Sequence, residues 1–360
     1  MNLNVLILPG DGIGPEVTRE AVRVLNRVAE KFGHTVETRE ALLGGIAIHK
    51  TGGPFPAETE KLCLECDATL MGAVGLPEFD EAPPEKRPEK GLLGIRKAMG
   101  VYANLRPVRT YAALIDSSPL KNALVEGTDM IIVRELTGGI YYGTPRGVSG
   151  EGPEERAVNT MTYTRAEIER VSRMAFELAR NRRKKLTSVD KSNVLENSQL
   201  WRRVIVDVAK DYPDVTLDHL LVDNAAMQLV LNPRRFDVMV TENMFGDILS
   251  DEGAVLAGSI GMLPSASIGA KRPSGVWVGL YEPVHGSAPD IAGQNKANPL
   301  GAIGSVAAML EYSFNLKEEA AAVNRAMEDV LNSGRVTADL KPKGAPATTE
   351  QVGAGVCEAI

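Results

Sequence analysis

The sequence predicts an α/β protein, because segments typical of buried strands alternate along the chain with segments typical of amphipathic helices. The first strand is expected at residues 2–9, which are almost entirely apolar, as in a strand buried on both faces. After a glycine turn, apolar residues recur at helical spacing from Val17 to Val28, and Gly33 is expected to end that helix. This order favours a sheet that helices cover on both sides.

The same alternation continues along the chain. Further strands are predicted at 67–74, 130–134, 186–189, 216–222 and 237–241, and helices at 57–65, 165–181 and 297–314. Thr164 and Glu167 form a capping box at the start of the second of these helices. Three loops are too long for plain connections, and we expect them to be functional: 75–91, 143–155 and 264–275.

Composition and charge exclude several classes of protein. The 360 residues are 44% hydrophobic and 24% charged, which is ordinary for a soluble globular protein of one large domain or two smaller ones. A net charge of −7 gives no sign of non-specific binding to nucleic acid or to anionic membranes. The apolar run at residues 5–8 is too short for a signal peptide or a membrane span.

The three cysteines provide no disulfide framework, so we expect a reducing cytoplasm. Cys63 and Cys66 form a CxxC motif, but a zinc site would need a second pair of ligands at suitable spacing. The motif also closes a predicted helix, whereas a redox pair would open one. We therefore interpret both cysteines as half-buried small side chains.

An acidic cluster is the first candidate for chemistry. Asp247 and Asp251 are spaced i and i+4, so on a helix they share a face, where a divalent cation would offset their repulsion. Asp223 follows a predicted strand and would lie at its carboxyl end, the edge at which open α/β sheets bind ligands. Ligands that are all oxygen favour Mg²⁺ or Mn²⁺ over Zn²⁺. A solvated helix face is the alternative, and the spacing alone does not separate the two.

Three arginines and two proton-transfer candidates are also noteworthy. Arg96, Arg106 and Arg134 lie near the ends of predicted elements, and guanidinium groups bind carboxylates through paired hydrogen bonds. Glycines flank Tyr141, which lets a ligand come close, and Lys191 follows a predicted strand. A lysine beside a metal and arginines would have its pKa lowered towards the working range. Taken singly, these arginines are better explained as surface salt bridges, and Tyr141 and Lys191 as half-exposed amphipathic side chains. Arg134 fits that explanation least, because it directly ends an apolar strand.

Two glycine-rich segments are candidates for binding a cofactor. Residues 10–14 read GxGxG, whereas the Rossmann fingerprint needs GxGxxG, so no Rossmann turn is predicted. Residues 286–293 form a second small-residue loop ahead of a helix, where backbone N–H groups could cradle a phosphate. A plain turn is the alternative for this loop, which His285 precedes.

Six blocks in order make the chain similar to the β-decarboxylating dehydrogenases, the family of isocitrate, isopropylmalate, homoisocitrate and tartrate/malate enzymes. The blocks are LPGDGIGPE (8–16), YANLRP (102–107), RELTGGIY (134–141), DKSNVL (190–195), NMFGDILSD (243–251) and EPVHGSAPDIAG (282–293). The resemblance implies an isocitrate/isopropylmalate dehydrogenase-like, non-Rossmann fold, in which two α/β domains share a large mixed sheet. The cofactor domain would be discontinuous (1–100 and 254–360), and residues 101–253 would bind substrate and metal and form the dimer.

The resemblance also implies roles for particular residues. Lys191 would take the proton of the substrate hydroxyl and Tyr141 would return one after decarboxylation. Lys191 and Asp223 would enter the neighbour's site in a homodimer, with an arm at about 143–160 as a clasp. The substrate residues would be Arg96, Arg106, Arg134, Asp223, Leu92, Glu89, Asn193 and Val194, and the metal ligands Asp223, Asp247 and Asp251. The cofactor residues would be Ile13, Gly75, Glu89, His285, Gly286, Ser287, Ala288, Pro289, Asp290 and Asn298.

Substrate and cofactor choice follow from two of these positions. Isocitrate enzymes place Ser or Thr where Leu92 stands, and a third carboxylate would be unpaired against Leu92 and Leu93 at a cost of roughly several kcal/mol. This favours 3-isopropylmalate, oxidised to 4-methyl-2-oxopentanoate in leucine biosynthesis, with weaker discrimination among 3-alkylmalates. Asp290 would bind the adenosine ribose and repel a 2′-phosphate, which favours NAD over NADP. Many relatives carry a glycine or a charged residue after Gly75, where this chain has Leu76, so the contacts of that loop with the cofactor stay open.

Alternative functions remain. Within the family they are a homoisocitrate or a tartrate/malate dehydrogenase. A phosphoryl transferase would use Mg²⁺, arginines and glycine loops, but the GxxxxGK[ST] loop is missing. A catalytically inactive, dimeric carboxylate-binding or scaffold protein is a third, and the presence of Tyr141, Lys191 and the three aspartates argues against it.

Overall fold

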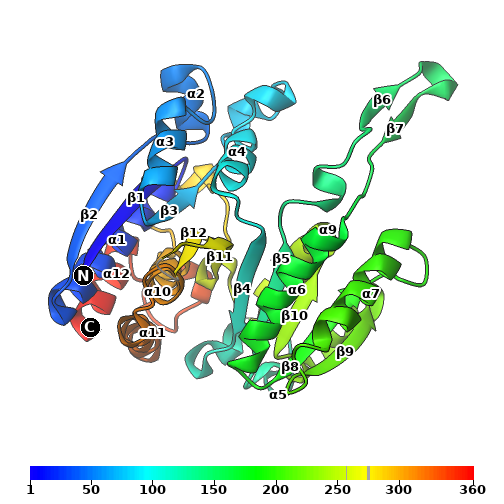
Figure 1. Ribbon diagram of the computed structural model, residues 1–360. Coiled ribbons are helices and arrows are strands. Elements are labelled where there is room, and N and C mark those ends of the chain that lie inside the picture. The colour runs from blue at the N-terminus through cyan, green and yellow to red at the C-terminus, as the bar shows by residue number, and fades with distance from the viewer. Residues whose placement is uncertain (257, 274–275) are drawn as a thin grey trace. The chain divides into compact units, whose positions relative to one another are not determined.

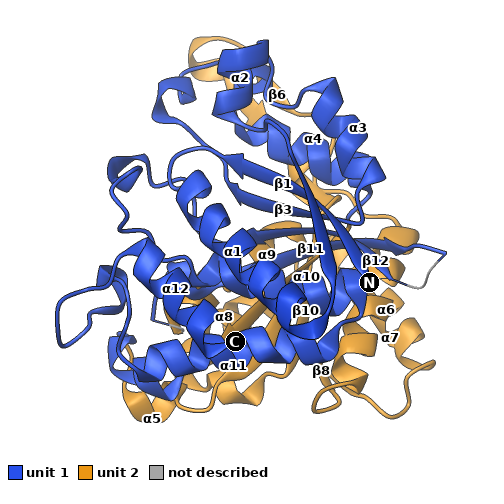
Figure 2. Cartoon of the chain, turned by 90° about the vertical axis from the view of Figure 1, so that its left-hand side faces the viewer, with its two compact units in different colours: residues 1–101, 111–119, 257–360 blue, residues 102–110, 120–256 orange. Residues whose placement is uncertain are grey.

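The computed structural model describes residues 1–256, 258–273 and 276–360, which form two compact units (Figures 1 and 2). Unit 1 comprises residues 1–101, 111–119 and 257–360, and unit 2 comprises 102–110 and 120–256. The predicted domains differ from this division at residues 101 and 111–119, which belong to unit 1, and at 254–256, which belong to unit 2. The chain thus passes from one unit to the other after residues 101, 110, 119 and 256.

Unit 1 is built on a mixed sheet in the order β2-β1-β3-β12-β11, in which only β11 and β12 pair antiparallel. Its strands are β1 (Asn2–Gly10), β2 (Thr35–Glu40), β3 (Ala68–Ala73), β11 (Pro264–Lys271) and β12 (Trp277–Pro283). Its helices are α1 (Gly14–Phe32), α2 (Gly45–Thr51), α3 (Ala57–Glu65), α4 (Glu89–Met99), α10 (Leu300–Phe314), α11 (Lys317–Asn332) and α12 (Thr349–Ala359).

The core of unit 1 lies between its sheet and the helices α1 and α10. Helix α10 is buried on nearly all sides and contacts β3, β11, β12, α1 and α11. Helix α1 begins with Pro15 in its first turn and ends at Gly33 in a left-handed conformation, as the sequence predicts. Thr348 and Gln351 form a capping box that starts α12.

In unit 2 the sheet runs in the order β4-β5-β10-β8-β9, and β4 and β5 pair antiparallel while the other pairs are parallel. The strands of this sheet are β4 (Ala103–Arg109), β5 (Asp129–Glu135), β8 (Lys185–Asp190), β9 (Thr216–Leu221) and β10 (Val238–Thr241). The helices are α5 (Asn122–Val125), α6 (Arg165–Arg180), α7 (Glu196–Ala209), α8 (Val222–Leu231) and α9 (Asn243–Leu256). Helix α6 packs with α7 and contacts β5, β8 and β10, while α8 packs with α9 on the opposite face of the sheet.

An arm leaves unit 2 and ends in a two-stranded antiparallel ribbon of β6 (Gly147–Ser149) and β7 (Arg156–Val158), seen at the upper right of Figure 1. All six residues of the ribbon strands are exposed. The ribbon therefore has no hydrophobic core of its own.

The α/β fold class is confirmed, but one element is wrong. The predicted loop 264–275 is largely strand β11, which pairs with β12 from Pro264 to Lys271, and its last two residues, Ser274 and Gly275, lie outside the described residues. The loop 75–91 contains the short 3₁₀ turns η1 (Pro77–Phe79) and η2 (Pro84–Lys86) and runs into α4.

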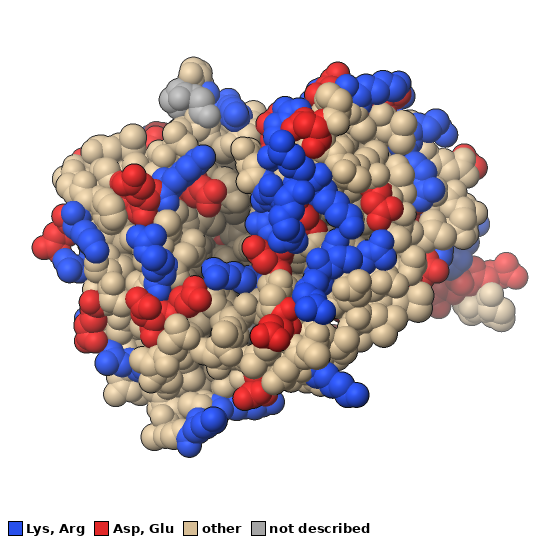
Figure 3. Space-filling model, turned by 90° about the horizontal axis from the view of Figure 1, so that it is seen from below, with Lys and Arg blue, Asp and Glu red and all other residues tan. Residues whose placement is uncertain are grey.

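The remaining general expectations concern cysteines, charge and membranes. Cys63 and Cys66 are buried free thiols, and burial raises the pKa of Cys63 to about 11, so the interpretation of small buried side chains holds. The face shown in Figure 3 carries a band of basic side chains, with acidic side chains beside it. Among the described residues, no helix combines the length and the apolar character needed to cross a membrane.

Candidate active site

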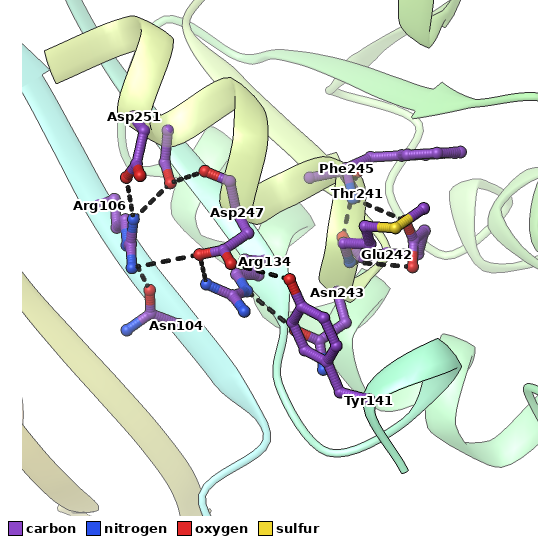
Figure 4. Close-up of polar contacts among 12 residues, drawn as sticks. Asn104, Arg106, Arg134, Tyr141, Thr241, Glu242, Asn243, Phe245, Asp247 and Asp251 are labelled. Atoms are coloured by element: carbon purple, nitrogen blue, oxygen red, sulfur yellow. Dashed lines mark hydrogen bonds and ion pairs between the residues drawn. The ribbon is translucent and has the colours of Figure 1, made fainter. Parts of the chain in front are cut away.

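The acidic pair predicted from the sequence lies on helix α9 of unit 2. Asp247 and Asp251 sit one turn apart, with side chains 35% and 61% exposed. Two arginines from neighbouring strands, rather than solvent alone, balance their charge (Figure 4). A purely solvated helix face is thus not what the structure contains.

Arg106 and Arg134 reach the acids from β4 and β5. Arg106 donates to Asp251 Oδ1 at 2.9 Å and to Ser250 Oγ at 2.6 Å, and its Nη2 lies 3.7 Å from Asp247 Oδ1. Arg134 donates from Nη1 to the same oxygen of Asp247. Both arginine side chains are about nine-tenths buried or more, so the ion pairs are shielded on the arginine side while the aspartates stay partly open to solvent.

Arg106 was expected near the end of an element, but it lies in the middle of β4. Asn104 and Arg106 are two residues apart on this strand and so share one face of the sheet. Asn104 is the register partner of Arg134 on β5. The strand pairing therefore places the two arginines side by side beneath α9.

Tyr141 ends the 3₁₀ turn η4 (Gly139–Tyr141) and directs its hydroxyl into the same cluster. The hydroxyl donates to Asp247 Oδ2 at 2.9 Å, and the Arg134 guanidinium carbon lies 5.6 Å from the centre of its ring. Burial and the hydrogen bond to the Asp247 carboxylate raise the pKa of Tyr141, so the phenol stays protonated at neutral pH.

Two buried carboxylates fix the backbone of the site, one before the turn that carries Tyr141 and one at the start of α9. Glu135, fully buried, accepts hydrogen bonds from the backbone N–H groups of Thr137 and Gly138 at 3.0 and 2.8 Å. Glu242 caps α9 by accepting from the N–H groups of Met244 and Phe245 at 3.1 and 2.6 Å, which places negative charge at the helix N-terminus. Burial raises the pKa of both carboxyls.

Gly246 is required by the close approach of α9 to Arg134. A Cβ atom at this position would lie 2.7 Å from Cβ and Cγ of Arg134. Any larger residue would therefore displace either the helix or the arginine.

Lys191 and Asp223 form a second centre in unit 2, at the carboxyl ends of the adjacent parallel strands β8 and β9. Lys191 Nζ lies 2.7 Å from Asp223 Oδ1, and this hydrogen bond lowers the pKa of the Asp223 carboxyl. Asn193 and Val194 follow in an exposed turn. No three His, Cys, Asp or Glu side chains of the described residues are grouped to hold a metal ion, so Asp223 does not join the α9 pair within the chain.

In unit 1, Arg96 lies on the last turn of α4 and is held by Glu282 of β12. Its Nη2 lies 2.7 Å from Glu282 Oε1, both side chains are buried, and its Nε has no hydrogen-bond partner among the residues that the structure describes. Leu92 is half-buried one turn earlier on α4, so its side chain and that of Arg96 share a helix face.

The residues expected to bind the cofactor also lie in unit 1, and several come together. The N–H of Ile13 donates to the carbonyl of Ser287 at 2.8 Å, and Gly12, with φ +57°, lies against the same carbonyl. A Cβ on Gly75 would lie 3.4 Å from Glu89 Oε1 and 3.5 Å from Ser287 Oγ. Ile13, Gly75, Glu89 and Ser287 thus border one region.

The loop after β12 lies ahead of a helix, as expected. The 3₁₀ turn η8 (Pro289–Ile291) follows Ala288, and α10 begins at Leu300. Gly286 and Asp290 are exposed, Pro289 lies beside Asp290, and among the described residues the Asp290 carboxylate has no partner. Asn298 is buried and accepts from the N–H of Leu300 while donating to Asp339.

Among the described residues, His285 carries the one buried side-chain polar atom of this loop that has no hydrogen-bond partner. Nδ1 lies 2.9 Å from the carbonyl of Gly286, which can only accept, so Nδ1 carries the proton. Burial lowers the pKa of His285 and keeps the ring neutral, which leaves Nε2 as a buried acceptor without a donor. A bound group with an N–H could donate a hydrogen bond to this Nε2 atom.

Several residues that build the site were not identified from the sequence. Asn104, Ser250, Asn243, Gly246 and Glu282 lie within or beside the blocks that carry the family resemblance, but no spacing rule distinguished them. Their importance depends on contacts between strands and helices far apart in sequence.

Comparison with known proteins agrees with this arrangement. The family model described as isocitrate/isopropylmalate dehydrogenase matches residues 4–356. The chain is 60% identical over 343 residues to the 3-isopropylmalate dehydrogenase of Geobacillus kaustophilus, covering 95% of this chain and 91% of that one. It is 55% identical to that of Halalkalibacterium halodurans, covering 100% and 98%. A crystal structure of isocitrate dehydrogenase from Methylococcus capsulatus superposes with a TM-score of 0.87 at 34% identity, covering 99% of both chains.

Proposed function

The chain belongs to the isocitrate/isopropylmalate dehydrogenase family, and from this premise we propose that it oxidises and decarboxylates (2R,3S)-3-isopropylmalate to 4-methyl-2-oxopentanoate with NAD in leucine biosynthesis. The observation that carries the proposal is the convergence of Arg106, Arg134 and Tyr141 on Asp247. Two relatives named 3-isopropylmalate dehydrogenase, at 60% and 55% identity, support this choice of substrate. The reduced thiols fit a cytoplasmic enzyme.

A divalent cation fits the α9 pair, because Asp247 and Asp251 present carboxylate oxygens on one helix face and both stay partly exposed. Asp247, Asp251 and Asp223 would hold Mg²⁺ or Mn²⁺, which would polarise the substrate hydroxyl and keto oxygen as a Lewis acid. Arg106 and Arg134 would then bind substrate carboxylates in place of the aspartates they hold in the ligand-free chain.

The chain's own groups would move the protons. Lys191 would accept the proton of the C2 hydroxyl as a hydride leaves C2 for the nicotinamide. After carbon dioxide leaves C3, the Tyr141 hydroxyl would donate a proton to that carbon. Each is an ordinary acid–base step for a positioned side chain.

NAD fits unit 1 through two unsatisfied acceptors. The buried Nε2 of His285 can accept from an amino group such as that of adenine, and the free Asp290 carboxylate can accept from two ribose hydroxyls. A 2′-phosphate would instead meet the negative charge of Asp290.

A homodimer would complete the site, since Asp223 and Lys191 lie apart from the α9 acids. An exposed apolar stripe follows Asp223 along α8 and continues on α9, with Met227 56%, Leu231 60% and Ile248 59% exposed. Because Asp223 and Met227 are one turn apart, a second copy covering the stripe would also meet Asp223. The exposed ribbon of β6 and β7 would serve as a clasp, because a lone two-stranded ribbon is marginal in water.

The test is a substrate panel followed by NAD reduction at 340 nm. Turnover of 3-isopropylmalate with NAD⁺, well above that of isocitrate, homoisocitrate and tartrate and above any rate with NADP⁺, is expected. EDTA should abolish turnover and Mn²⁺ should restore it. Preference for another acid would assign a different branch of the family, and activity without metal would refute the role of the aspartates.

A further inference from the structure

Two buried asparagines hold the arginines of unit 2 in matching ways. Arg106 Nε donates to Asn104 Oδ1 at 2.9 Å, and Arg134 Nε donates to Asn243 Oδ1 at 2.9 Å. Asn104 is fully buried and Asn243 is 1% exposed. Because a guanidinium group can only donate, each amide must turn its oxygen towards the arginine.

The Nε contacts determine which edge of each guanidinium faces the acids. With Nε occupied, the Nη atoms point towards Asp247 and Asp251, as Figure 4 shows. A planar guanidinium fixed at one edge cannot rotate without breaking that hydrogen bond, so its remaining donors have a defined direction. This is the edge that a substrate carboxylate would meet.

Asn104 and Asn243, which hold the two arginines, are neutral amides, and this neutrality affects how the arginines can bind an anion. An aspartate or glutamate would hold Nε more strongly, but it would also neutralise the arginine in a buried site. An amide oxygen fixes the orientation and leaves the full positive charge. In unit 1, by contrast, a charged partner holds Arg96, because its Nη2 donates to the carboxylate of Glu282.

Asn243 is itself tightly held. Its backbone N–H donates to the Tyr163 hydroxyl at 3.0 Å, and its Nδ2 donates to the carbonyl of Gly138 at 3.0 Å. Gly138 immediately precedes the turn that carries Tyr141. One amide therefore orients Arg134 and ties it to the backbone of the tyrosine turn.

We propose that Asn104 and Asn243 are positioning residues that orient Arg106 and Arg134 without placing a further negative charge beside them, so that the two arginines can exchange Asp247 and Asp251 for the carboxylates of a dicarboxylate. The inference rests on the proposed function, because it assigns substrate binding to these arginines. It extends that function by making the neutrality of both holders a requirement for anion affinity.

The proposal predicts opposite effects on two ligands. Asn104→Asp keeps an acceptor for Nε but adds a negative charge beside Arg106. Dicarboxylate affinity should fall about tenfold or more, because a guanidinium already paired with a carboxylate attracts an anion less. Affinity for Mn²⁺ alone should stay equal or rise. A merely structural defect would weaken both ligands together.

The experiment measures 3-isopropylmalate and malate binding by calorimetry and Mn²⁺ binding by electron paramagnetic resonance on the full-length protein. Asn181→Asp is the matched control, since it adds the same charge at an exposed helix end of unit 2. Asn243→Asp is the second test variant, with the same expected signs, and thermal unfolding verifies that each variant is folded.

The outcomes separate the two proposals. Weaker dicarboxylate binding with unweakened Mn²⁺ binding in a folded variant supports the positioning role. Unchanged dicarboxylate affinity, or equal loss of both ligands, overturns it. Wild-type protein that binds malate but not 3-isopropylmalate would refute the proposed substrate and still test the asparagines.

Discussion

The hydroxyl oxygen of Tyr141 lies 2.9 Å from Asp247 Oδ2, so one carboxylate joins the candidate proton donor to the candidate cation site. The other oxygen of Asp247 is shared by Arg134 and Arg106. A change to any of these groups is therefore expected to affect the others, and single substitutions should not behave additively.

Replacing Tyr141 by phenylalanine removes the hydroxyl and keeps the ring over Arg134. We expect kcat to fall about 10²–10⁴-fold, the range for loss of a general acid, with a smaller change in KM. Steady-state kinetics with 3-isopropylmalate measures this. Tyr212→Phe is the control, because its hydroxyl donates to Glu177 outside the candidate site, and a similar loss there would point to general damage.

Lys191→Met should retain NAD binding and lose hydride transfer. The substitution keeps the apolar stem and removes the amine that contacts Asp223 at 2.7 Å. The rate should fall by a factor on the order of 10²–10⁴, measured by stopped-flow absorbance together with NAD titration. Lys210→Met removes an exposed ion pair with Asp207 in the same unit and should leave the rate unchanged. An active Lys191→Met enzyme would exclude the proposed role.

Gly246→Ala should raise the KM for substrate more than it lowers stability. The new methyl group would overlap the Arg134 side chain, at 2.7 Å from its Cβ and Cγ. We expect a KM increase of about tenfold and a loss of unfolding free energy of about 1–3 kcal/mol, the usual cost of overpacking. Gly253→Ala, on the same helix but against Val108 at 3.0 Å, should destabilise without changing KM.

Leu92→Ser should shift specificity towards isocitrate. A hydroxyl one turn before Arg96 could hydrogen-bond a third carboxylate, which the wild-type leucine leaves unpaired. The ratio of kcat/KM for isocitrate to that for 3-isopropylmalate should rise at least tenfold, on the order of 1–3 kcal/mol. An unchanged ratio would place the specificity pocket elsewhere.

We predict that the difference in stability between the wild type and a variant at Glu20 depends on pH. Burial raises the pKa of this carboxyl above 4.5, although Arg19 and Arg23 each lie 3.5 Å from one of its oxygens, and it lies against Gly353 of α12. A carboxyl whose folded pKa is raised favours the folded state when protonated, so its contribution is lost as pH rises from 4.5 through the folded pKa.

Glu20→Gln should therefore gain stability relative to the wild type as pH rises through this interval, by about 1 kcal/mol. Urea unfolding at several pH values between 4 and 8 measures the difference. Glu30→Gln, at an exposed position of the same helix, should show no such trend. A difference that stays constant with pH would contradict the assignment.

The fold class was predictable because β1 and β5 contain apolar runs and α1 and α6 have clear caps and stripes. Strand β11 was missed because serine, alanine and glycine dominate it. These small residues form a strand through antiparallel pairing with β12, and Gly269 lies against the backbone of Gly100. That close packing comes from tertiary structure, which local propensity does not record.

The site was predictable for residues whose chemistry is unusual and less so for residues that support them. Asp247, Asp251 and Lys191 stand out by spacing or by position after a strand. Asn104 and Asn243 do not, because an asparagine becomes a holder for an arginine only when strand register and helix placement bring them together. Such contacts span up to 109 residues of sequence.

The path of the chain restricts how this protein could be divided. Because β4 of unit 2 is enclosed in sequence by segments of unit 1, no single cut of the polypeptide releases either unit whole. A fragment ending near residue 256 would lack β11, β12 and α10, and so would leave the rest of unit 1 without a large part of its sheet and core. We therefore expect the two units to fold only as parts of the whole chain.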